Sequence, residues 1–211
     1  MAKHFVLVAG NIGSGKTSLT ERIGKRLGWD TAYESVVDNP YLADFYTDMK
    51  QWAFHLNVFF LGHRADQHEE LAASGKSAII DRSIYEDAEI FARAAVSLGT
   101  LSERDYQTYR HVYEQVVDGL PSPDLLIFLK APTTVLYERI QQRGREMEKT
   151  MTLEYLDLLE RYYEEWLASF DHCPVLTIRT DDLDFVHKPQ HLDVVVARIR
   201  EKLLGREEIT F

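Results

Sequence analysis

The eight residues Gly10-Asn11-Ile12-Gly13-Ser14-Gly15-Lys16-Thr17 constrain the fold more strongly than any other segment. They match the pattern G-x-x-x-x-G-K-[ST], in which glycines let backbone N–H groups curve around phosphate oxygens. The short apolar run Phe5–Ala9 precedes this loop, and a helical segment, Thr17–Leu27, follows it. The context predicts a site for a nucleoside triphosphate, with Lys16 at the β and γ phosphates and the Thr17 hydroxyl on Mg²⁺. The motif does not identify the acceptor.

Short apolar runs separated by helix-length segments predict an α/β fold with a parallel sheet covered on both faces. The predicted strands are Phe5–Ala9, Ala78–Asp81, Leu125–Leu129 and Val175–Ile178, with a weaker fifth strand around Thr31–Tyr33. Periodicity and end signals predict helices over Thr17–Leu27, Met49–Ser74, Ile84–Leu98, Ser102 to about Val117, Thr133–Gln142, Thr152–Phe170 and Leu192–Leu204. There is no repeat or linker, so residues 1–211 are interpreted as one domain.

The charge balance excludes some classes of partner. The net charge of −10 argues against a general nucleic-acid surface, because phosphate backbones are repelled by such a field. Cys173 is the single cysteine, which excludes an intrachain disulfide and a cysteine-rich metal site. The N-terminus does not have the pattern of a signal peptide, and no stretch approaches the roughly 20 apolar residues of a membrane span. A cytoplasmic protein without membrane contact is therefore expected.

Two further groups of residues have the chemistry of phosphate transfer. Asp81 ends an apolar run and is followed by Arg82, so it is a candidate Mg²⁺ ligand beside the glycine loop. Arg139, Arg143 and Arg145 surround Gly144 and form a candidate lid, over residues 139 to about 150, that closes on the phosphates. The alternatives are a surface Asp–Arg pair and a solvated basic helix end.

A third group lies between the glycine loop and Asp81. Asn57 and Arg64 are seven residues apart on one predicted helix and therefore share a face, with Phe54 one turn before Asn57. An aromatic ring, an amide and a guanidinium on one face can stack on a nucleobase and hydrogen-bond to it. From spacing alone, a core-packing role for Phe54 and a plain surface role for Arg64 are equally well supported.

At this point the chain resembles the deoxyribonucleoside kinase family, from Val6 to about Phe185. The matching parts occur in the family's order: GNIGSGKT, Glu34, W-x-F-x-x-N at Trp52–Asn57, Arg64, DRSIYED at Asp81–Asp87, RIQQRGRE at Arg139–Glu146 and EYLDLLERYYEEWL at Glu154–Leu167. The resemblance implies a P-loop kinase fold with a five-stranded parallel sheet. It also implies a homodimer that uses ATP and Mg²⁺ to phosphorylate the 5′-hydroxyl of a deoxynucleoside, a small-molecule substrate.

The same resemblance implies roles for individual residues. Glu34 corresponds to the base near the 5′-hydroxyl and Arg82 to its charged neighbour. Tyr46 and Glu164 correspond to a pair that grips the sugar 3′-hydroxyl, and Arg64 and Asp87 to the groups that discriminate the base edge. The segment Thr180–Phe185, which includes Asp182, corresponds to the loop beside the ATP adenine.

Two departures from the family pattern bear on the substrate. Asn57 stands where the family usually has Gln, and Asp81 replaces the commoner Glu. The Arg64 and Asp87 pair would crowd the thymine methyl, and the shorter Asn57 leaves room for a larger base. Deoxyadenosine or deoxyguanosine is therefore predicted as the best substrate, deoxycytidine next and thymidine poor, with a deoxycytidine-preferring enzyme as the alternative.

Other readings of the same motifs stay open. A nucleoside monophosphate kinase shares the loop and lid but needs several arginines for its charged acceptor, whereas Arg64 is the only arginine in residues 34–70. A sugar or shikimate-like kinase would have no use for the face that carries Asn57. A non-catalytic nucleotide-binding partner subunit is the remaining alternative.

Overall fold

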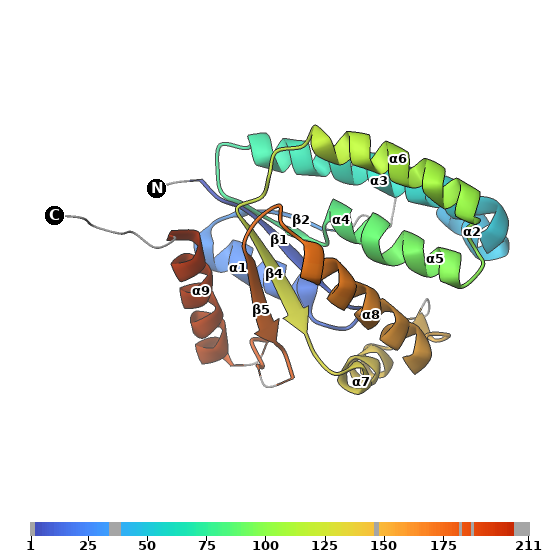
Figure 1. The fold of residues 1–211 in the computed structure, drawn as a ribbon. Helices are drawn as coiled ribbons and strands as arrows, with labels where there is room; N and C mark the ends of the chain where they lie inside the picture. The colour runs from blue at the N-terminus through green and yellow to red at the C-terminus, as the bar shows by residue number, and fades with distance from the viewer. Residues whose placement is uncertain (1–2, 34–38, 146–147, 182, 187, 205–211) are drawn as a thin grey trace.

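The computed structural model describes residues 3–33, 39–145, 148–181, 183–186 and 188–204. These residues form a five-stranded parallel sheet with the order β2-β3-β1-β4-β5 (Figure 1). The strands are β1 (Phe5–Gly10), β2 (Asp30–Ala32), β3 (Ala78–Asp81), β4 (Leu125–Lys130) and β5 (Val175–Arg179). β1 lies at the centre, so the loop that leaves its carboxyl end lies between the ends of β3 and β4, where ligands of open α/β sheets bind.

Helices cover both faces of the sheet. The helical elements are α1 (Lys16–Leu27), α2 (Leu42–Thr47), α3 (Met49–Ala73), α4 (Ile84–Glu86), the π-helix η1 (Asp87–Ala92), α5 (Arg93–Ser97), α6 (Glu103–Asp118), α7 (Thr133–Arg143), α8 (Leu153–Ser169) and α9 (Pro189–Leu204). Figure 1 shows α1 and α9 on one face, and α3 to α6 with α8 on the other. None of the helices in the described part of the chain has the length and apolarity needed to cross a membrane.

Alternate strand residues supply the two cores. In β1, Phe5, Leu7 and Ala9 pack with α3 to α6 and α8, whereas Val6 and Val8 pack with α1 and α9. All six residues of β1 are buried, which explains why the strand reads as a continuous apolar run rather than an alternating one.

The five predicted strands and the parallel α/β architecture are confirmed. The prediction of one continuous helix over Ile84–Leu98 was wrong, because this segment is α4, the π-helix η1 and α5. The wider turn begins where two successive carboxylates, Glu86 and Asp87, are both buried, and such turns are frequent at functional sites. α2 was not predicted, because its six residues are too few for a periodic signal.

His68 on α3 makes the stability of this fold depend on pH. The ring is 1 % exposed, and its Nε2 lies 2.7 Å from the Pro121 carbonyl oxygen, to which the neutral ring donates. Burial lowers the pKa of His68, and the hydrogen bond to Pro121 opposes this only in part. Below the ordinary pKa of about 6.5 the unfolded chain therefore binds a proton that the folded chain resists. The free energy of unfolding should fall from pH 7 to pH 5, by up to about 1.4 kcal/mol per pH unit from this residue.

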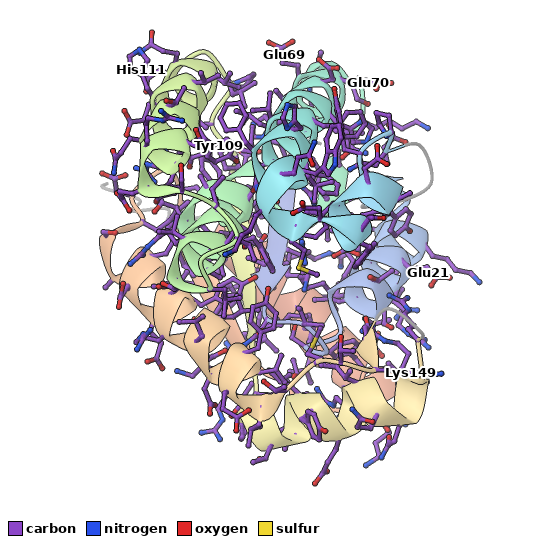
Figure 2. The ribbon with its side chains drawn as sticks, turned by 90° about the vertical axis from the view of Figure 1, so that its right-hand side faces the viewer. Glu21, Glu69, Glu70, Tyr109, His111 and Lys149 are labelled. Atoms are coloured by element: carbon purple, nitrogen blue, oxygen red, sulfur yellow. The ribbon has the colours of Figure 1, made fainter. Side chains whose placement is uncertain are left out.

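Urea denaturation of His68→Gln at pH 7 and pH 5 checks this expectation. Glutamine can still donate to the Pro121 carbonyl but does not titrate, so the loss of stability on acidification should be smaller than in the wild type. His111→Gln is the control, because His111 is exposed on α6 and points away from the sheet in Figure 2. An unchanged pH dependence in His68→Gln would contradict the assignment.

Candidate active site

The glycine loop begins at Gly10, whose backbone no other residue could adopt without a clash. Its φ is 148°, and a Cβ there would lie 2.6 Å from the Leu129 carbonyl oxygen and 2.8 Å from Ser14 Oγ. α1 starts directly after the loop, at Lys16. The Lys16 ammonium donates to the carbonyl oxygens of Gly10 (2.7 Å) and Asn11 (3.2 Å). A cation and a helix N-terminus therefore lie together at the carboxyl end of the central strand, which suits a polyphosphate.

Asp81, at the end of β3, lies beside this loop. The register pairs Val8 with Asp81, and the Thr17 hydroxyl donates to Asp81 Oδ2 at 2.5 Å. The Thr17 hydroxyl and the Asp81 carboxylate are oxygen ligands of the kind that suits Mg²⁺, which is bound through one or two protein oxygens together with water and phosphate oxygens. No group of three or more His, Cys, Asp or Glu side chains that could hold a metal occurs among the described residues.

Arg82 follows Asp81 in a strained backbone conformation. Its φ of 71° is the only positive value outside glycine in the described part of the chain. Its N–H donates to the Val8 carbonyl at 2.9 Å, and its guanidinium carbon lies 4.1 Å from the centre of the Phe91 ring. Strain of this kind at a strand end is typical of functional positions.

A cavity of about 500 Å³ opens on one side of the glycine loop. It is lined by Gly13, Ser14, Gly15, Ser18, Arg139, Gln142, Arg143, Thr180, Asp181, Leu183, Asp184, Phe185, Val186 and Lys188. The structure thus brings the segment after β5 to the glycine loop, as expected for the adenine side of a nucleotide site. Asp182 lies outside the described residues.

Two of the three predicted lid arginines line this cavity. Arg139 donates to the Thr180 hydroxyl (3.0 Å) and to the Thr180 carbonyl (2.5 Å). Arg143 donates to both carboxylate oxygens of Glu148, at 3.1 and 2.5 Å. Arg145 does not line the cavity, and its guanidinium lies 3.8 Å from Glu148. In this structure the arginines are held by protein groups at the edge of the nucleotide cavity.

A second cavity, of about 460 Å³, contains Arg82. Its lining is mostly apolar and aromatic: Phe45, Tyr46, Met49, Leu56, Asn57, Phe60, Arg82, Asp87, Phe91, Ala95, Leu98, Thr100, Thr150, Met151, Thr152 and Tyr155. Polar groups are few and come from different elements, an arrangement typical of a site for a small, largely apolar molecule. We call this the acceptor cavity.

Arg64 and Asp87 form a buried ion pair at this cavity. Their side chains are 4 % and 7 % exposed, and Arg64 Nε faces Asp87 Oδ2. Asp87 lines the acceptor cavity and Arg64 does not, so Arg64 pairs with the carboxylate from outside the cavity lining. The buried Tyr109, which lies between α6 and α3 in Figure 2, has a pKa raised well above 10, first by burial and then by the Asp87 carboxylate.

Besides Arg64, two further predicted substrate residues, Phe54 and Glu164, do not line the acceptor cavity. Phe54 packs against the core instead, because it lies about 60° to one side of Asn57 around α3, whereas the cavity-lining Leu56 and Phe60 lie on the other side. The structure does not bring Glu164 to the cavity that Tyr46 lines: Glu164 is exposed and accepts from Lys130 at 2.8 Å. Glu164 comes nine positions after the cavity residue Tyr155. Nine positions are about two and a half helical turns, so Glu164 lies on the opposite side of α8. Glu34 lies outside the described residues.

Three polar residues behind the glycine loop, Glu86, Glu160 and Tyr163, were not predicted from the sequence. Asn11 Nδ2 donates to the Leu156 carbonyl (3.0 Å) and to Glu160 (3.1 Å), and burial raises the pKa of Glu160. Glu86 and Tyr163 contact Gly10. The S-x-x-E pattern at Ser83–Glu86 was the available signal for Glu86, because it is a helix capping box.

Comparison with known proteins agrees with this geometry. The model of the deoxynucleoside kinase family matches residues 6–204. A deoxyadenosine/deoxycytidine kinase of Bacillus subtilis is 40 % identical over 92 % of this chain and 90 % of its own length. A deoxyguanosine kinase of the same organism is 34 % identical over 95 % of this chain and 98 % of its own. The structure of a deoxyadenosine kinase from M. mycoides with dCMP and a flexible dCDP bound has a TM-score of 0.80 at 28 % identity, over 93 % of this chain and 98 % of that one. This chain belongs to the deoxynucleoside kinase family.

Proposed function

We propose that this enzyme transfers the γ-phosphoryl group of ATP to the 5′-hydroxyl of a deoxynucleoside, and that deoxyadenosine is its best substrate. The acceptor cavity is the observation that supports this choice of substrate. Asp87 and Arg82 both line it, and Arg82 directly follows β3, the strand that pairs with β1 before the glycine loop. The names of the relatives, which include deoxyadenosine/deoxycytidine and deoxyguanosine kinases, support the same class of substrate.

The phosphate side supplies positive charge where the transferred group passes. Lys16 leaves the carbonyls of the loop and binds the β and γ phosphates, while Arg82 lies between the loop and the acceptor. Arg139, Arg143 and Arg145 close from α7 and the residues after it. Thr17 and Asp81 would hold Mg²⁺, which neutralises phosphate charge when bound. Glu34 orients the 5′-hydroxyl and accepts its proton, a role that the resemblance supports.

The base side offers hydrogen-bond acceptors. Asn57 Nδ2 donates one of its two protons to the Ala53 carbonyl at 2.7 Å, which leaves the amide oxygen and the second N–H for a ligand. Asp87 adds a carboxylate held in place by Arg64. Two acceptors favour a base with an exocyclic amine, such as the 6-amino group of adenine or the 4-amino group of cytosine, over thymine, which has none. Tyr46, on the same cavity, is the proposed contact for the sugar.

The rival kinase is less well supported. A nucleoside monophosphate acceptor carries a phosphate, and Arg82 is the only cationic side chain among the described residues that line the acceptor cavity. The homodimer, which the resemblance implies, and the cytoplasmic location, which the sequence pattern suggests, stay predictions.

A panel of nucleosides with ATP and Mg²⁺ tests the proposal. The kcat/KM should be highest for deoxyadenosine, next for deoxycytidine, lower for deoxyguanosine and at least about tenfold lower for thymidine, because O4 of thymine faces the carboxylate. Purine 2′-deoxyriboside, which lacks the 6-amino group, is the matched probe and should also lose at least about tenfold. Thymidine as the best substrate would refute the proposed base preference. ATP binding without transfer to any nucleoside would favour the non-catalytic partner subunit.

A further inference from the structure

The backbone N–H and the carbonyl of Gly10 are both held by side chains. Its N–H donates to Glu86 Oε1 at 3.3 Å. Its carbonyl oxygen lies 2.7 Å from the Lys16 ammonium and 2.9 Å from the Tyr163 hydroxyl. Gly10 is the first residue of the phosphate loop, so these contacts fix where the loop begins.

Glu86 is a fully buried carboxylate whose contacts are with neutral donors. Besides Gly10, it accepts from Ser83 N–H (2.7 Å), from the Ser83 hydroxyl (3.0 Å) and from the Tyr163 hydroxyl (2.6 Å). The carboxylate thereby joins the loop after β1, the start of α4 and the middle of α8. A buried charge is retained in a protein only when such donors satisfy it.

The Tyr163 hydroxyl has one proton and two acceptors within hydrogen-bond distance. The acceptors are Glu86 Oε1 at 2.6 Å and the Gly10 carbonyl at 2.9 Å. Burial raises the pKa of Tyr163 well above 10, so the hydroxyl stays protonated. Rotation about the C–O bond is enough to move this donor from one acceptor to the other.

We propose that Tyr163 is a positioning residue that takes over the Gly10 carbonyl when Lys16 leaves it for the phosphates of ATP. In the structure described here Lys16 donates to that carbonyl, and Tyr163 can donate to Glu86. When Lys16 turns to the nucleotide, the Tyr163 proton turns to Gly10, and Glu86 keeps its donors from Gly10 and Ser83. The loop carbonyl is then never left without a donor.

The physical reason is the penalty for an unsatisfied buried acceptor. When a buried carbonyl loses its donor and no water replaces it, the unsatisfied acceptor costs free energy. Because ATP binding is the step that removes the donor here, this cost would lower the affinity for ATP. Tyr163 therefore contributes to ATP affinity without touching ATP. The proposal rests on the proposed function only in that Lys16 binds the phosphates.

Tyr163→Phe tests the proposal in the full-length protein. The change removes one oxygen and leaves the ring, which packs 5.6 Å from the centre of Phe128. Titration with MgATP should show a dissociation constant raised about five- to tenfold, an effect of the size expected for one unsatisfied buried acceptor. The KM for deoxyadenosine, measured at saturating ATP, should stay within about twofold, because the acceptor cavity lacks this residue.

Tyr162→Phe is the matched control. It removes the neighbouring hydroxyl of α8, whose hydrogen-bond partner is Ser97 Oγ, at 2.5 Å, rather than Gly10. Thermal denaturation of both variants measures the general loss of stability. Unchanged ATP affinity in Tyr163→Phe overturns the proposal, as does an equal loss for ATP and nucleoside, or an equal loss in Tyr162→Phe. If the wild type binds ATP but phosphorylates no nucleoside, the proposed function fails while the ATP titration still decides the role of Tyr163.

Discussion

Asp87→Asn is expected to lower the free energy of unfolding by about 3–5 kcal/mol, because it removes one partner of a buried ion pair. The Arg64 side chain is 4 % exposed and would be left as a buried guanidinium beside a neutral amide. The same change replaces a carboxylate that lines the acceptor cavity with a group that presents both a donor and an acceptor. The kcat/KM for deoxyadenosine should fall at least about a hundredfold, and discrimination against thymidine should weaken. Urea denaturation and the nucleoside panel measure the two effects.

Glu89→Gln provides the control within the same π-helix. Glu89 pairs with Arg110, but their side chains are 22 % and 26 % exposed, so solvent screens the pair. Its loss should lower the free energy of unfolding by about 1 kcal/mol at most and leave the base preference unchanged. Equal effects of the two changes would show that burial does not set the importance of Asp87.

The double change Arg64→Met with Asp87→Leu separates stability from specificity. Replacing a buried ion pair by apolar residues of similar volume is often neutral for stability, because no charge stays buried without a partner. The double variant should therefore recover most of the stability lost in Asp87→Asn. It should not recover deoxyadenosine preference, since the cavity no longer has a carboxylate. A double variant that still prefers deoxyadenosine would place the base-reading group elsewhere.

The parts of the site that the sequence predicted are those set by local pattern. The glycine loop follows from a motif of eight residues and its flanking strand and helix, and Asn57 and Arg64 follow from a separation of two helical turns. Counting helical turns would also have excluded Glu164, because nine residues along α8 reverse the face that Tyr155 presents. The shared face of Asn57 and Arg64 and the opposite face of Glu164 can each be worked out from positions on a single helix.

The remaining parts depend on contacts between distant segments. Glu86 meets Gly10 across 76 positions and Tyr163 across 77, and no periodicity marks such a pair. The π-helix at Asp87–Ala92 likewise interrupts a segment whose local pattern predicts an ordinary helix. Burial of two successive carboxylates is a property of the packed structure, because each is stabilised only by partners that folding brings to it.

Lys16→Met is expected to lower kcat/KM for phosphate transfer about 10³-fold or more, the largest effect on activity predicted for this chain. Methionine keeps most of the length of the side chain but removes the charge that reaches the transferring phosphoryl group. Stability should change little, because Tyr163 can satisfy the Gly10 carbonyl and the Ser14 N–H still donates to the Asn11 carbonyl at 3.2 Å. Lys25→Met is the control, since Lys25 is exposed at the other end of α1 and adds an equal change of net charge. Initial rates with deoxyadenosine and thermal denaturation of both variants decide the outcome. Activity within tenfold of the wild type in Lys16→Met would mean that Arg82 and the arginines of α7 supply the charge that the glycine-loop lysine is expected to supply.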